Sequence, residues 1–208
     1  MVAPFRLHSG DPVPVQQTST TCGSASLTVA RMLVDPAFAQ WIRLGVPRDP
    51  AAPMDTGSET ARFAAYEQVV ARRTGGWFGG GGRPQLPWPR AFGTSPWGAR
   101  NELRFGAGAP GARWHVAWFR LGSRERLGRA YDDLVASVRP GRPGVLYIGS
   151  PTLPRHVVLA LPPTGGDGLD VYEPSVGRVV GLSREAFVTR RLRLAGWDVP
   201  WAAVHDAS

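Results

Sequence analysis

The order of the hydrophobic patterns constrains the fold of this chain more than any other feature. Apolar residues recur at helical spacing in three stretches, residues 20–34, 57–73 and 124–138. Strand-like runs at 114–119, 145–149, 156–161, 169–172 and 177–181 lie mostly after the last of these, with an extended tail near 197–204. A helical first part followed by a strand-rich part with turns between the strands predicts an α+β fold with an antiparallel sheet.

The length and the middle of the chain bear on its organisation. With 208 residues, we expect a single domain spanning 1–208. The irregular segment 75–112 is dense in glycine, proline and tryptophan, and linkers rarely carry so many aromatic residues. We therefore expect an ordered loop that packs its aromatic rings and walls a cleft. A flexible linker remains the alternative for residues 79–82.

The charge of the chain is one-sided. All 24 basic residues are arginine, against 16 acidic residues, giving a net charge of +8. We attribute the absence of lysine to a GC-rich bacterial genome. An arginine-rich, nucleic-acid-binding protein is the alternative, but the arginines are spread along the chain, so we expect no obligatory nucleic-acid partner.

No apolar run reaches the ~18 residues of a membrane span, and no secretory signal stands at the start. These observations favour a cytoplasmic protein.

The single cysteine, Cys22, excludes an internal disulfide framework and a cysteine-based zinc cage. It lies at the beginning of the first predicted helix, capped by Thr20 or Thr21. The free N–H groups and the positive end of the helix dipole favour a thiolate there, the reactive form of the side chain. Gly23 is expected to leave open space beside the sulfur. The alternative is a buried cysteine that only fills a gap in the core.

A cysteine nucleophile needs a base and a group that orients the base. His156 begins an apolar strand, whereas His8 and His205 lie near the termini and His115 is a candidate core histidine. A hairpin centred near residue 164.5 places Glu173 opposite His156, and a carboxylate there can orient the imidazole. Asp170 is the rival orienting residue, but it falls on the other face of the strand. A surface salt bridge is the simpler explanation of the pair.

A hydrolase of this kind also needs donors for the oxyanion. The backbone N–H of Cys22 can supply one, and a glutamine amide just upstream, Gln16 or Gln17, can supply a second. Solvent-facing glutamines are the alternative explanation.

Together these residues resemble the C39-like, papain-fold cysteine peptidases. The segment VQQTSTTCGSASL is similar to the Q-x5-C-G-x-A start of that family, and Gln16 stands six residues before Cys22, which selects it over Gln17. RHVVLAL resembles the family's histidine strand, and VYEPSVGRVVGLSREAF resembles its acid-Pro turn and following helix. This chain departs from the pattern with Glu173 in place of the usual Asp, and with Thr21 before the cysteine.

The resemblance implies a fold, an activity and a set of roles. The fold is a papain-like domain in which an N-terminal helical half packs on a C-terminal antiparallel sheet. The activity is that of a cysteine peptidase or amide hydrolase acting on a peptide or protein, with no metal or cofactor. Cys22 is then the nucleophile, His156 the base, Glu173 its orienting acid, and Gln16 an oxyanion-hole donor. A catalytically degenerate homologue that binds protein is the alternative, motivated by Glu173.

Overall fold

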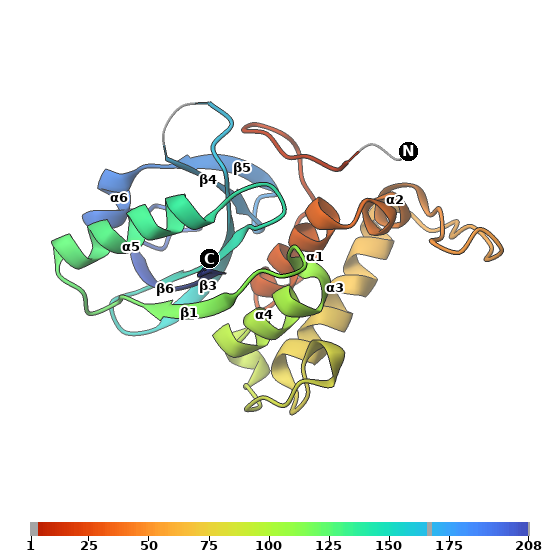
Figure 1. Cartoon of the computed structure of the whole chain (residues 1–208), viewed down its shortest axis with the longest axis horizontal. Coiled ribbons are helices and arrows are strands. Elements are labelled where there is room, and N and C mark those ends of the chain that lie inside the picture. Colours follow the sequence, from red (N-terminus) through yellow and green to blue (C-terminus); the bar gives the residue numbers. More distant parts are fainter. Residues whose placement is uncertain (1–3, 166–167, 208) are drawn as a thin grey trace.

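A six-stranded antiparallel sheet forms the C-terminal half of the molecule (Figure 1). The computed structural model describes residues 4–165 and 168–207. The strand order across the sheet is β1-β6-β2-β3-β4-β5, and every neighbouring pair is antiparallel. The strands are β1 (Trp114–Trp118), β2 (Gly144–Gly149), β3 (Pro154–Leu161), β4 (Leu169–Glu173), β5 (Arg178–Leu182) and β6 (Val199–Asp206). The central strands β2, β3 and β4 are almost wholly buried, because helices cover both faces of the sheet.

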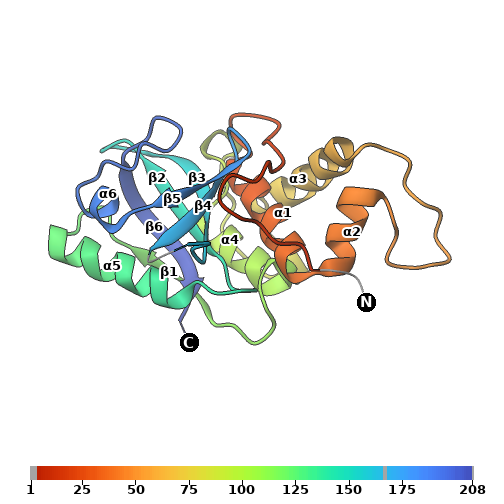
Figure 2. The same cartoon turned by 90° about the horizontal axis from the view of Figure 1, so that it is seen from above.

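The helices divide between the two faces of the sheet (Figure 2). One group makes up the N-terminal half: α1 (Cys22–Val34), α2 (Pro36–Leu44), α3 (Glu59–Gly75) and α4 (Pro96–Glu102). The helices α5 (Arg124–Ser137) and α6 (Arg184–Val188) cover the opposite face. Each face has its own hydrophobic core, one containing Leu27 and Leu159 and the other Leu134 and Val158. The predicted α+β arrangement, with a helical half packed on an antiparallel sheet, is confirmed.

Most elements lie where the hydrophobic patterns place them, and the differences arise at helix ends. Ser58 is the N-cap of α3 and accepts from the N–H of Ala61, so this helix begins at Glu59, two residues after the predicted start at residue 57. The residue pair Asp35-Pro36 ends α1 and also begins α2, where the Asp35 carboxylate accepts from the N–H of Phe38. A proline in the first turn of a helix loses no helical hydrogen bond, so the same two residues serve both purposes.

The segment 75–112 is more regular than its composition predicts. It contains α4 and three short turns of 3-10 or π helix, at Gly80–Gly82, Arg90–Phe92 and Leu103–Ala107. Its rings pack on one another, with the Trp88 and Trp97 centroids 5.0 Å apart in an edge-to-face pair. The Trp97 indole N–H donates to the Leu86 carbonyl at 2.7 Å. The expected packing of aromatic rings is therefore found at Trp88 and Trp97, whereas Trp77 and Phe78 are each 67% exposed.

Helix α1 is the element that brings the two halves together. Nearly all of its residues are buried, and it packs along β3, where the Ser26 hydroxyl donates to the Val157 carbonyl at 3.4 Å. Since Cys22 is the first residue of α1 and His156 lies near the start of β3, this packing places the two side chains at the same end of the interface.

Candidate active site

Cys22 lies in the wall of a cleft of about 390 Å³ between the helical half and the sheet. The same cleft is lined by Gln16 and His156. The thiol is 3% exposed and Cys22 is the first residue of α1, so the positive end of the helix dipole acts directly on it. The Thr21 hydroxyl donates to the Thr18 carbonyl and makes no capping bond to α1, which leaves the first-turn N–H groups for a ligand.

The His156 imidazole bridges Cys22 and Glu173. Its Nε2 atom lies 2.6 Å from Glu173 Oε1, and both side chains are buried. Because Nε2 is engaged by the carboxylate, Nδ1 is the nitrogen left to serve the Cys22 thiol, which lies close enough to the ring to raise the pKa of His156. Burial lowers the pKa of His156, but the hydrogen bonds and charges of Cys22 and Glu173 outweigh it and raise this pKa from 6.5 to about 9. The imidazole is therefore held as a cation at neutral pH.

The carboxylate of Glu173 is stabilised by the same contact. Burial raises its pKa, but the hydrogen bond and charge of His156 and the N–H of Ser175 outweigh burial and keep this pKa below its usual range. Ser175 donates its backbone N–H to Oε1 at 3.0 Å. The pair thus combines an ionised acid with a protonated base in a buried setting, which is the strong, charge-assisted kind of hydrogen bond.

The register of the β3–β4 hairpin differs from the predicted one. Leu159 lies opposite Tyr172 and Leu161 opposite Asp170, so the hairpin is centred one residue later than 164.5. The predicted placement of Glu173 directly opposite His156 is therefore wrong, because the turn is shifted; its residues 166 and 167 lie outside the described part of the chain. Extending this register makes His156 and Glu173 diagonal neighbours on one face, a separation that long side chains span.

The length of the side chain explains why residue 173 is a glutamate and not an aspartate. A diagonal pair of residues lies farther apart across a sheet than a direct pair. The extra methylene of Glu173 covers part of that distance and allows the 2.6 Å contact with His156. Asp170, the rival candidate, is engaged elsewhere, because its carboxylate accepts from the N–H of Thr164 at 2.9 Å and from the Thr164 hydroxyl.

The turn that follows β4 ties the acid to the segment carrying Gln16. The Gly177 N–H donates to the Glu173 carbonyl at 3.0 Å, and Gly177 has a positive φ of 61°, which favours glycine. A Cβ at this position would also meet the Val13 carbonyl oxygen at 2.3 Å. The Gln16 N–H donates to the Pro174 carbonyl at 2.9 Å. The acid and the Gln16 segment are therefore fixed relative to each other through the backbone.

The Gln16 side chain is oriented by its own loop. Its Nε2 donates to the Thr18 carbonyl at 2.8 Å, which uses one of the two amide hydrogens and leaves the second for a ligand. Glu67 of α3 supports the loop, since its buried carboxylate accepts from the Gln17 N–H at 3.1 Å. Gln17 itself is tied back to the Val15 carbonyl, so Gln16 is the glutamine that faces the cleft.

Gly23 serves a different purpose from the one the sequence predicts. It does not provide open space, because a Cβ at this position would lie 2.5 Å from Cβ of Thr94 and 2.6 Å from its hydroxyl. Thr94 belongs to the segment 75–112 and lines the cleft. The missing side chain therefore lets this segment pack closely against the first turn of α1.

Tyr147 of β2 is a cleft residue that sequence reasoning missed. Its side chain is 4% exposed and, among the described residues, its hydroxyl has no hydrogen-bond partner. Burial and the nearby charge of Cys22 raise the pKa of Tyr147 well above its usual value, so the hydroxyl is a donor. The signal in the sequence was a tyrosine, Tyr147, within the otherwise aliphatic strand VLYIG. A buried hydroxyl without a partner calls for a ligand that can accept its hydrogen bond.

Aromatic side chains from both halves of the molecule line the cleft. The segment 75–112 contributes two rings to one wall, as predicted, and residues of the sheet half contribute three indoles: Trp88, Phe92, Trp118, Trp197 and Trp201. The Arg120 guanidinium lies 4.3 Å from the Trp201 ring centroid. The walls thus offer apolar surface to a ligand, while its polar groups lie around Cys22.

The other histidines lie outside this cleft. His115 and His205 are opposite one another on β1 and β6, with ring centroids 4.1 Å apart, and they line a separate hollow. His8 is exposed and contacts Asp11.

Comparison with known proteins adds one structural likeness. No protein-family model matches the sequence, and the search of curated proteins also gives no match. Among solved structures, the Pseudomonas avirulence protein AvrPphB is similar, with a TM-score of 0.47 and 14% sequence identity over 97% of this chain and 96% of that chain. Within residues 4–165 and 168–207, no helix has both the length and the apolar character of a membrane span.

Proposed function

We propose that this chain is a papain-like cysteine hydrolase, similar to the C39-like peptidases, that cleaves an amide bond in a peptide or protein. The observation that carries the proposal is the position of His156. Its imidazole is bonded to Glu173 at 2.6 Å, and it shares a cleft of about 390 Å³ with the Cys22 thiol, which helps to raise its pKa. A nucleophile, its base and an orienting group in mutual contact are the parts that nucleophilic catalysis needs.

The first half-reaction transfers the acyl group to sulfur. The Cys22 thiolate attacks the carbonyl carbon, and the carbonyl oxygen becomes an oxyanion. We assign the Cys22 N–H and the free amide hydrogen of Gln16 as its donors, with the Tyr147 hydroxyl as a third donor to the substrate. His156 then gives its proton to the leaving amine as the carbon–nitrogen bond breaks, which leaves a thioester on Cys22.

The second half-reaction returns the enzyme to its starting state. Neutral His156 takes a proton from water, the hydroxide oxygen attacks the thioester carbon, and the thiolate leaves. Glu173 holds the imidazole in place in both steps and stabilises its cationic form. An amine in place of water would give a transferase, and the same residues support that chemistry.

The alternative of a catalytically degenerate binding module was motivated by Glu173 in place of aspartate. In the structure the longer side chain reaches His156, so this departure from the family pattern does not separate the two residues.

A thiol-directed activity probe tests the proposal. Wild type, Cys22→Ser and His156→Ala are incubated with the probe at neutral pH, and adducts are measured on the intact protein. We expect one adduct on native wild type, none on Cys22→Ser and a strongly reduced rate in His156→Ala. Native wild type that resists the probe, while the unfolded chain reacts, would contradict the proposal.

A further inference from the structure

The positive charge of the chain is concentrated in one segment. Residues 68–124 contain nine arginines and one acidic residue, Glu102, whereas the rest of the chain contains fifteen arginines and fifteen acidic residues. The whole net charge of +8 therefore belongs to this segment. Glu102 offsets little of it at the surface, because it is 2% exposed and is paired with Arg73 at 3.0 Å.

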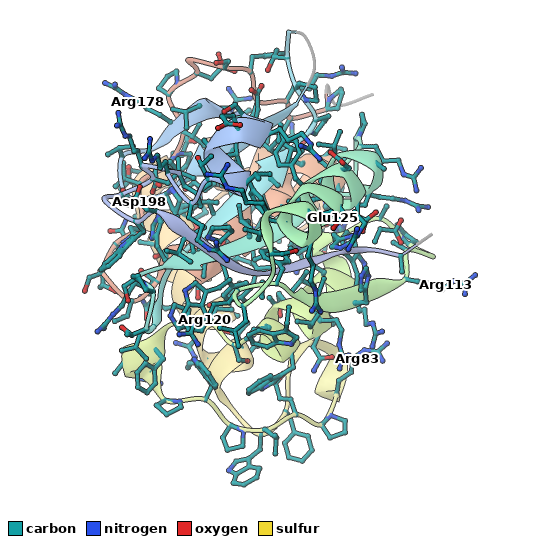
Figure 3. The ribbon with its side chains drawn as sticks, turned by 90° about the vertical axis from the view of Figure 1, so that its left-hand side faces the viewer. Arg83, Arg113, Arg120, Glu125, Arg178 and Asp198 are labelled. Carbon is teal, nitrogen blue, oxygen red and sulfur yellow. The ribbon has the colours of Figure 1, made fainter. Side chains whose placement is uncertain are left out.

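The same segment exposes large apolar side chains at one end of the molecule. Trp77, Phe78 and Leu86 are each 67% exposed, and Phe105 is 42% exposed. Figure 3 shows ring-bearing side chains extending from the lower end of the molecule, where Arg83 lies beside them. We call these four apolar residues together with Arg83 the aromatic tip. Large apolar side chains gathered on one exposed end mark an interaction surface.

Hydrogen bonds hold the backbone of the aromatic tip in the conformation that exposes its side chains. The Gly79 N–H donates to the Arg83 carbonyl at 2.8 Å, and the Gln85 N–H donates to the Trp77 carbonyl at 2.9 Å. The Gln85 side-chain amide donates to the carbonyls of Arg73 and Gly76. The tip is thus a hydrogen-bonded, hairpin-like projection with exposed aromatic rings.

Three arginines in this segment, Arg83, Arg100 and Arg104, lie close enough for their charges to act on Arg104. Burial, and then the charges of Arg100 and Arg83, lower the pKa of Arg104, whose guanidinium donates to the Trp114 carbonyl at 3.1 Å. An anionic surface would offset these positive charges and accept hydrogen bonds from the guanidinium groups.

We propose that the aromatic tip docks the protein on an anionic lipid bilayer. Trp77 and Phe78 enter the interface between headgroups and acyl chains, the position that aromatic rings favour, while Arg83 and its neighbours contact lipid phosphates. A single-stranded nucleic acid offers the same phosphates and stacks on rings. It gains little from the aliphatic Leu86, which is as exposed as Trp77. A bilayer takes up both kinds of side chain, so it fits the tip better.

Vesicle flotation with the full chain tests this proposal. The probes are phosphatidylcholine vesicles with and without phosphatidylglycerol, and a variant with Trp77→Ala and Phe78→Ala is compared with wild type. We expect binding only to the anionic vesicles and at least a tenfold loss in the double variant. Arg83→Gln is expected to weaken binding about fivefold at low salt. Arg178→Gln is the matched control, because Arg178 lies at the opposite end of the molecule (Figure 3) and outside residues 68–124.

A second readout separates insertion from attraction by charge alone. Brominated acyl chains quench tryptophan fluorescence only on contact, and we expect quenching in wild type that is largely lost in Trp77→Phe. The proposal is overturned if anionic vesicles do not bind wild type, if Arg178→Gln weakens binding as much as Arg83→Gln, or if no Trp77-dependent quenching occurs. Tip-dependent binding to a single-stranded oligonucleotide without vesicle binding would overturn it in favour of nucleic acid.

Discussion

Shortening Glu173 by one methylene, in Glu173→Asp, should uncouple the acid from His156 even though aspartate is the usual residue of the resembling family. The present contact is 2.6 Å between Oε1 and Nε2. Removing one carbon–carbon bond, about 1.5 Å long, would leave the oxygen about 4 Å from the nitrogen, beyond hydrogen-bond range. By extension of the hairpin register the two residues are diagonal neighbours, so an aspartate would have to span the longer, diagonal separation.

The loss of the hydrogen bond between residue 173 and His156 can be expressed as a change in the pKa of His156. A hydrogen bond to a charged group contributes about 1.5–3 kcal/mol, and one pKa unit corresponds to about 1.4 kcal/mol. The pKa of about 9 should therefore fall by about 1–2 units in Glu173→Asp. Since the folded-state pKa is raised above 6.5, its contribution to stability is fully present below pH 6.5 and is lost as the pH rises through about 9. The variant should lose stability mainly at neutral and lower pH.

An NMR titration of the imidazole resonances measures this change, with His156→Ala to assign the signal. Glu173→Gln should lower the pKa as well, because it removes the charge while keeping the length. Asp170→Asn is the matched control and should leave the His156 pKa unchanged, since Asp170 is engaged with Thr164. A wild-type titration curve in Glu173→Asp, or an equal shift in Asp170→Asn, would refute the reasoning.

Three further substitutions test neighbouring parts of the site. Gln16→Ala should lower kcat/KM by about 10²–10³ while the rate of Cys22 alkylation, which forms no oxyanion, stays unchanged; a parallel loss of alkylation would point to a structural role. Tyr147→Phe should lower turnover without lowering Tm, because it removes a buried hydroxyl that has no partner among the described residues; unchanged turnover would contradict its assignment as a donor. Gly23→Ala should cost about 1–3 kcal/mol by overpacking against Thr94, and calorimetry should show Thr94→Gly restoring most of the lost Tm.

The order of the elements was readable from the sequence because hydrophobic spacing reports burial directly. The stripe on α5 and the alternating runs of β2 to β5 each bury a face that the chain itself specifies. The pairing of His156 with Glu173 was also accessible, since a hairpin places residues on its two strands side by side, and Cys22 was marked by its position at a helix start. The helix α4 was missed, because the glycines and prolines around it hide a short helical segment that starts at Pro96.

The features that sequence reasoning missed depend on tertiary contacts between distant segments. The space at Gly23 is filled by Thr94, which lies 71 positions later in the sequence, and no local sequence pattern predicts that contact. The hairpin register depends on the conformation of one turn, so the diagonal relation of Glu173 to His156 is visible only in three dimensions. The same holds for Glu67, which supports the Gln16 loop from another helix.

The central claim is that Cys22 forms a thioester with an acyl group. An activated acyl ester such as p-nitrophenyl acetate, mixed with wild-type protein and quenched in acid, allows the adduct to be weighed and mapped. We predict one acetyl group per chain on Cys22, formed in a burst, released by hydroxylamine and absent from Cys22→Ser, with slower formation in His156→Ala. Native wild-type protein that releases nitrophenol no faster than Cys22→Ser and gains no acetyl group would contradict the account.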